Sequence, residues 1–275
     1  MKITITNIIS ILLLALMSFF ALKAYDNAKS YEEMTQIIVE KHNVSQLSKN
    51  QLKKFADTLS FGLYDGYEEL LKEQKKSKEV QEFFRHKAKD YTLYYMLVLL
   101  AMLLLYFILS LRAYTILVSI SALLSLAIGL ITPIMMMSIH KEVEYLGDVV
   151  LTMESKGVLG SIAKLFDSGD IIVAGALLLF SILLPLLKTL SMLFVAIFIE
   201  SRFAHTIVHF FKLLGKWSMA DVFVVSTFLV YLSASKGEMS RAEVQVGIYF
   251  FLAYVIVSML ASLSADKMLQ ENKEA

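Results

Sequence analysis

The sequence predicts an all-α, polytopic membrane protein with six transmembrane helices. Hydrophobic residues make up 57% of the 275 positions and the mean hydropathy is +0.64, whereas a soluble domain is roughly 45–50% apolar. The excess is gathered in six blocks, most of them long enough to cross a bilayer as a helix. The net charge of +1 gives no electrostatic reason to expect nucleic-acid binding, and a chain without cysteine forms no disulfide or thiolate metal site.

The first block covers residues 3–22, which carry no charge and follow Lys2. A cleaved signal peptide needs small residues at positions −3 and −1 of its cleavage site. Cleavage after Ala24 would place Leu22 at −3. We therefore expect residues 1–24 to form an uncleaved signal-anchor helix.

Residues 25–90 are the long polar segment of the chain, with apolar residues at helical spacing, as at Leu52 and Phe55. The Asp65-Gly66 pair is typical of a break between helices. We expect a helical hairpin outside the membrane. Two roles stay open for it, a solvated cap and a domain that senses a ligand or docks a partner.

The second and third spans are predicted at residues 91–112 and 113–139. The second begins with several tyrosines, as in the aromatic belt at a membrane surface. Arg112 separates the two spans in what we expect to be a tight turn. Pro133 removes one backbone hydrogen bond from the third span, so we expect a kink there.

Residues 140–170 are predicted to be a polar loop with an amphipathic stretch at 158–166 that lies at the membrane interface. The fourth span covers residues 171–199. As a helix it would be about 43 Å long, which exceeds the roughly 30 Å hydrocarbon core, so it must tilt, bend or extend beyond it. The chain closes with a fifth span, a sixth span and a charged tail, at residues 217–235, 244–265 and 266–275.

Six spans place both termini on one side of the membrane. Short segments on that side carry seven Lys or Arg: Lys2, Arg112, Arg202, Lys212, Lys216, Lys267 and Lys273. Short loops on the other side carry five: Lys141, Lys156, Lys164, Lys236 and Arg241. The positive-inside rule then predicts cytoplasmic termini and an extracytoplasmic hairpin.

The fourth span contains a charge at Lys188, which costs about 3 kcal/mol at the bilayer centre on insertion scales. We expect Asp221, which opens the fifth span, to compensate it. Ser181 lies two turns before Lys188 on the same face, and Pro185 between them bends the helix. With Ser258 in the sixth span, these residues predict an intramembrane polar network of Ser181, Lys188, Asp221 and Ser258.

Plainer interpretations stay open for each member of this network. Lys188 can extend its long side chain to the cytoplasmic interface. Ser218-Met-Ala-Asp221 fits a capping box, in which Asp221 only completes a helix N-terminus. Ser258 fits the packing role that serine often has between membrane helices.

Four motifs follow one another in the second half of the chain: TPIM at 132–135, GVLGSIAKLF at 157–166, FSILLPLLK at 180–188 and GKWSMADVFVV at 215–225. The last, which contains Trp217, Ser218 and Met219, is the most specific. In this order the motifs resemble the integral-membrane domain of the paraquat-inducible protein A family, which includes the LetA-type proteins of bacterial envelopes.

The resemblance implies a tetraspanin-like four-helix membrane domain over residues 113–265. It also implies a partnership with an MCE-type tunnel protein in phospholipid transport between the two membranes of Gram-negative bacteria. Lys188 and Asp221, and by position Ser181 and Ser258, would then belong to an intramembrane network with a role in proton coupling. Family members often carry zinc ribbons and two membrane modules. This chain lacks cysteine and a second module, so no metal is expected, and residues before 113 have no family counterpart.

Two functions remain open. The first is an inner-membrane component of a lipid-transport and envelope-integrity system. The second is a membrane receptor or adaptor whose hairpin at 25–90 binds a ligand or partner. An intramembrane hydrolase is not favoured, since the sequence has no H-E-x-x-H motif and no paired intramembrane aspartates. We expect no catalytic residue and no cofactor.

Overall fold

The computed structural model describes residues 2–41, 66–143, 147–198 and 240–274. Within them, five helices are long and apolar enough to cross a membrane: Asn7–Glu40, Lys75–Phe107, Leu111–Ile131, Ile171–Ile197 and Gly247–Asn272. The prediction of an all-α polytopic membrane protein is confirmed. The predicted fifth span, residues 217–235, lies outside the described residues.

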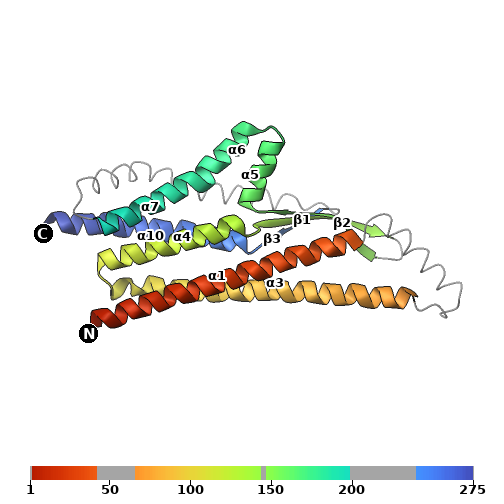
Figure 1. Cartoon of the computed structure of the whole chain (residues 1–275), viewed down its shortest axis with the longest axis horizontal. Helices are drawn as coiled ribbons and strands as arrows, with labels where there is room; N and C mark the ends of the chain where they lie inside the picture. The colour runs from red at the N-terminus through yellow and green to blue at the C-terminus, as the bar shows by residue number, and fades with distance from the viewer. Residues whose placement is uncertain (1, 42–65, 144–146, 199–239, 275) are drawn as a thin grey trace.

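The first two spans and the polar hairpin form two continuous helices rather than separate units. α1 (Lys2–Lys41) runs without a break from an apolar half into a polar half, and α3 (Gly66–Leu104) runs without a break from a polar half into an apolar half. They pack against one another (Figure 1), and in the polar halves the Gln81 amide donates to the Thr35 hydroxyl over 2.6 Å. The described parts of the hairpin, residues 25–41 and 66–90, therefore continue the membrane spans as helix.

Arg112 does not lie in the turn between the second and third spans. α3 is followed by a 3₁₀ turn, η1 (Leu105–Phe107), and α4 (Leu111–Ile131) begins after Ser110. Arg112 lies in the first turn of α4. Its guanidinium donates to the carbonyl oxygens of Ala196 (3.0 Å) and Ile197 (2.7 Å) at the end of α7 (Leu184–Ile197). A cation there satisfies orphan carbonyls and opposes the helix dipole.

Replacing Arg112 with glutamine is expected to lower the free energy of unfolding by about 1 kcal/mol, because the two hydrogen bonds from a charged donor are lost or weakened at a partly exposed site. Thermal unfolding of the purified protein in detergent would show this as a lower midpoint. Lys89→Gln is the control, because Lys89 is an exposed lysine on the polar half of α3. Equal midpoints for both variants would contradict the capping role.

The third span is shorter than predicted, and Pro133 ends it instead of kinking it. α4 stops at Ile131, and Thr132 has extended backbone angles (φ −84°, ψ 142°). The ring of a proline disfavours helical geometry at the residue before it. The prediction of a span over 113–139 is therefore wrong over its last eight residues, 132–139.

A small antiparallel sheet replaces part of the predicted polar loop. β1 (Met135–Val143) lies between β2 (Gly147–Lys156) and β3 (Ser240–Val244), and Met135 pairs with Lys156 on one side and Val244 on the other. The strands were missed because a clear alternation of apolar and polar residues, the pattern of a strand with one covered face, is present only in β3. β1 begins with three consecutive methionines, and β2 contains the apolar run Val149-Val150-Leu151.

The predicted amphipathic stretch forms α5 (Val158–Asp167). After it, α6 (Ile171–Leu178), η2 (Leu179–Leu183) and α7 form one helical rod that corresponds to the predicted fourth span. The last span is α10 (Gly247–Glu274), which starts after β3 rather than at residue 244.

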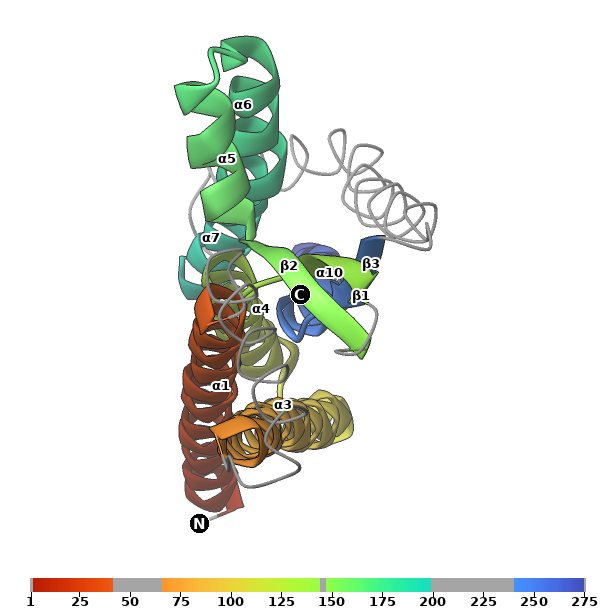
Figure 2. The same cartoon turned by 90° about the vertical axis from the view of Figure 1, so that its right-hand side faces the viewer.

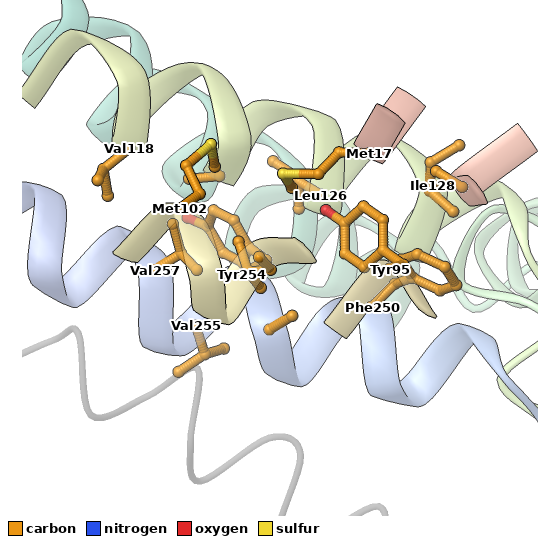
Figure 3. Packing of buried hydrophobic residues seen from close by; sticks show 14 of the residues in the cluster. Met17, Tyr95, Met102, Val118, Leu126, Ile128, Phe250, Tyr254, Val255 and Val257 are labelled. Carbon is orange, nitrogen blue, oxygen red and sulfur yellow. The ribbon is translucent and has the colours of Figure 1, made fainter. Parts of the chain in front are cut away.

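α4 and α10 form the centre of the bundle, with α1 and α3 on one side and α5 to α7 on the other (Figure 2). A Cβ on Gly129 of α4 would lie 2.9 Å from the backbone nitrogen of Phe251 on α10, so the two helices approach as closely as small residues permit. The core around Tyr95, Phe250 and Met17 joins α1, α3, α4 and α10 (Figure 3). The beginning of α1 and the end of α10 lie at the same end of the molecule (Figure 1).

Candidate functional site

One face of the rod formed by α6, η2 and α7 is buried, with α7 packed on α4 and α10 and α6 packed on α5. Most of its buried residues recur at intervals of three, four or seven: Ala174, Ser181, Pro185, Thr189, Met192 and Ala196; Val195 is also buried. Positions with this spacing lie on one side of a helix. Ser181 is therefore on the buried face of the rod, and Lys188 lies half-buried beside Thr189 at the edge of this stripe.

The rod is irregular where Ser181 lies. η2 is a π-helical turn, in which the amide of Leu184 donates to the carbonyl of Leu179, five residues earlier. Pro185 is the second residue of α7 and has no amide hydrogen to offer the carbonyl of Ser181. π turns are rare and are found frequently at functional sites. The sequence pointed to Pro185 as the source of a disturbance, but the wider turn before it had no sequence signal of its own.

α7 meets α10 through a pair of hydroxyls that the sequence analysis missed. The Thr189 hydroxyl donates to the carbonyl of Pro185 (2.9 Å) and lies 3.5 Å from the Tyr254 hydroxyl of α10. Thr189 and Tyr254 are 1% and 0% exposed. Both could have been suspected from spacing, since Thr189 follows Lys188 and Tyr254 lies one turn before Ser258.

Of the other two residues predicted for the network, the structure describes Ser258 but not Asp221. Ser258 is buried in α10, and its hydroxyl donates to the carbonyl of Val255 in the same helix (3.0 Å). Asp221 lies outside the described residues, as do Trp217, Ser218 and Met219. The structure thus brings the helices of Ser181, Lys188 and Ser258 together through Thr189 and Tyr254. The pairing of Lys188 with Asp221 stays a prediction.

Further hydroxyl pairs connect the central helices. Thr115 of α4 and Ser264 of α10 are 2.6 Å apart, and so are Tyr95 of α3 and Ser125 of α4. The buried hydroxyl of Ser119, one turn after Thr115, has no hydrogen-bond partner within the part of the chain that the structure describes. The contact surfaces inside this bundle are therefore lined by small hydroxyl side chains, which suits close packing in a membrane.

A second polar cluster lies on the polar halves of α1 and α3. Glu243 of β3 accepts from Arg85 of α3 (2.9 Å) and from the Tyr31 hydroxyl of α1 (3.0 Å). Beneath these polar contacts, Val246 packs with an alanine from each helix, Ala28 and Ala88. We call this set the Glu243 cluster. It fastens the strand that leads into α10 to both helices of the hairpin.

Glu243→Gln is expected to loosen the hairpin, because it removes the charge that pairs with Arg85 and weakens the acceptor of the Tyr31 hydroxyl. A partly exposed ion pair contributes up to about 1 kcal/mol, and 1 kcal/mol is roughly a factor of five in a local opening equilibrium. Hydrogen–deuterium exchange should therefore be up to about fivefold faster in the polar halves of α1 and α3. Glu79→Gln, at an exposed position of α3, is the control. Identical exchange in all three proteins would contradict the fastening role.

Among the described residues, no group of three or more His, Cys, Asp or Glu could hold a metal ion. Within the described residues, the polar side chains of the intramembrane site are hydroxyls and the ammonium of Lys188, which suit hydrogen bonding and the binding or exchange of a proton. They do not form a nucleophile and base pair among the contacts described above.

Comparisons with known proteins match the second part of the chain. The family model described as "Paraquat-inducible protein A" matches residues 112–270, from the first turn of α4 almost to the end of α10. A Haemophilus influenzae protein named "Probable intermembrane transport protein" is 27% identical over 118 residues, which are 41% of this chain and 28% of that protein. The chain thus aligns with less than a third of this relative's length. No solved structure matches.

The match leaves out α1 and α3, so these two helices are an addition to the part of the fold that the family model covers. The matched residues span more than half of the chain and include the stripe that carries Ser181, Lys188 and Thr189 as well as Ser258. The chain belongs to the paraquat-inducible protein A family.

Proposed function

We propose that the chain is the inner-membrane component of a system that moves phospholipid between the membranes of a bacterial envelope, and that it works with an MCE-type tunnel protein. The observation that supports this most directly is the family match over residues 112–270, together with the name of the relative as an intermembrane transport protein. Residues 113–265 would be the transport domain. The chain termini would be cytoplasmic, with the hairpin and the sheet on the other side.

The mechanism that we propose uses the rod of α6, η2 and α7 as the lipid-facing element. In the apolar 18-residue stretch of Ile171–Ile197, only 17% is buried inside the protein, whereas 67% of the corresponding stretch of α4 is buried. Lipid would therefore reach the half-buried Lys188 along the exposed side of this rod. A lysine in a low-dielectric site tends to lose its charge, and a neighbouring carboxylate restores it. A Lys188–Asp221 pair would thus take up and release a proton as the environment of the rod changes.

The test is to isolate the protein from membranes in mild detergent and to identify bound lipids and proteins by mass spectrometry. We expect phospholipid and an MCE-type protein in the eluate. A membrane protein of the same cell with a similar number of spans, purified in parallel, corrects for carried-over lipid. Recovery of neither an MCE-type protein nor phospholipid above that control would contradict the proposal.

A receptor or adaptor is the second candidate, and the Glu243 cluster favours it because contact at the hairpin would be passed directly to the strand before α10. Deleting residues 30–88 removes the polar halves of both helices and keeps their apolar halves. Loss of the envelope barrier at an unchanged protein level would favour the receptor. A retained barrier would favour the transporter.

A further inference from the structure

A cavity of about 370 Å³ lies at the end of the bundle where α10 ends. It is lined by the last turn of α3, by η1, by the start of α4 and by α10. Ligand pockets measure roughly 300–1,000 Å³, so it can take part of an extended molecule. Its walls are mainly leucine and aromatic side chains, including Leu103, Leu104 and Phe107 on one side and Leu260 and Leu263 on the other.

The walls of this cavity face the lipid side of the helices. Phe107 is 82% exposed, and Leu104 and Leu263 are each more than half exposed. All three lie on segments that are long and apolar enough to cross a membrane. An exposed apolar groove on such helices is in contact with acyl chains and not with water.

One end of the cavity is polar. The ammonium of Lys267 donates to the hydroxyl of Tyr106 over 3.1 Å and lies 5.7 Å from the centre of the Tyr106 ring. Lys267 is the first cation after the uncharged apolar run of α10, which places it at the head-group level of a bilayer. Tyrosine is enriched at that level. The cavity thus combines apolar walls with an oriented cation and a hydroxyl at one end.

We propose that this cavity binds one anionic phospholipid, with an acyl chain between η1 and α10 and the phosphate on Lys267 and Tyr106. Both polar groups can donate to phosphate oxygens, since the Tyr106 hydroxyl can accept from Lys267 and donate onward. Basic pockets between membrane helices bind anionic head groups in this way. The site lies apart from Lys188 and is built partly by η1 and α3, which the family match does not include. It does not depend on the proposed transport function.

Native mass spectrometry of the full chain in detergent tests the site, with phosphatidylglycerol as the anionic probe and phosphatidylcholine as the zwitterionic one. We expect one phosphatidylglycerol per chain, held about tenfold more tightly than phosphatidylcholine. Lys267→Gln should remove this preference, whereas Lys78→Gln, at an exposed position on the polar half of α3, should keep it. Equal binding of phosphatidylglycerol by the wild type and Lys267→Gln would overturn the proposal.

A photoactivatable phosphatidylglycerol with the reactive group in its acyl chain gives the position independently of any variant. Cross-links should concentrate in the peptides that contain residues 103–107 and 260–267. Cross-links spread evenly over the lipid-facing helices would show bulk contact and overturn the proposal. Lys188→Ala should keep these cross-links whether or not it supports lipid transport, so failure of the transport mechanism and failure of this site give different results.

Discussion

Lys188→Ala is expected to abolish the ability of the gene to restore the envelope barrier in a deletion strain, while the amount of protein in the membrane stays near the wild-type level. A lysine deep in a membrane helix costs about 3 kcal/mol on insertion scales, so alanine eases insertion of the span. Loss of function could then not be assigned to poor insertion. The measurement pairs a barrier assay, such as detergent sensitivity of the cells, with quantification of the protein.

Lys188→Arg and Asp221→Asn test whether Lys188 must exchange a proton or need only carry a positive charge. Lys188→Arg keeps a positive charge, but arginine does not deprotonate in proteins. If proton exchange is required, this variant should fail as Lys188→Ala does, and Asp221→Asn should fail with it. If charge alone is required, Lys188→Arg should retain function. Full restoration by both Lys188→Ala and Asp221→Asn would exclude the proposed mechanism.

Gly247→Ala is expected to lower the free energy of unfolding by about 3 kcal/mol, at the upper end of the usual cost of overpacking. The new Cβ would lie 2.6 Å from the carbonyl oxygens of both Thr132 and Pro133. These are backbone atoms, so the segments after α4 and before α10 would have to separate. The hydrogen bonds from the Gly247 amide to Pro133 (3.0 Å) and from the Gln245 amide to Ile134 (2.9 Å) would be strained or lost.

Thermal unfolding in detergent would measure this effect, with Gly175→Ala as the matched control. A Cβ on Gly175 meets nothing within 4 Å, and Gly175 lies inside α6, where alanine is favoured over glycine by roughly 0.5–1 kcal/mol. The control should therefore unfold at the wild-type midpoint or slightly above it. A midpoint for Gly247→Ala as high as that of the control would contradict the tight junction.

The membrane helices could be predicted from sequence because a bilayer imposes both a length and a scarcity of charge on any segment that crosses it. The same criterion misled over residues 132–139, where the Met135-Met-Met137 run continued the apolar block after Pro133 had already ended the helix. β1 begins with three consecutive methionines, so it had no clear alternation to set against the hydropathy of the preceding span.

The intramembrane site was predictable only in part. Lys188 and Ser181 were identified because a charge and a proline in an apolar span each require a physical explanation. Thr189 and Tyr254 are ordinary residues in a sequence of this composition, and their importance arises from a contact between helices 65 positions apart. The Glu243 cluster is similar, because its members come from three elements that a single sequence does not place together.

The junction at Gly247 and Pro133 has a mechanical consequence. Backbone hydrogen bonds join the segment after α4 to the start of α10 and the residues before it, and the two helices also make a close contact at Gly129. Neither helix can therefore slide along the other without breaking both. Together they behave as a fixed frame. In a cycle that exposes a lipid first to one side and then to the other, the frame would stay still, and the π turn before Pro185 is the point in the neighbouring rod where a hinge could operate.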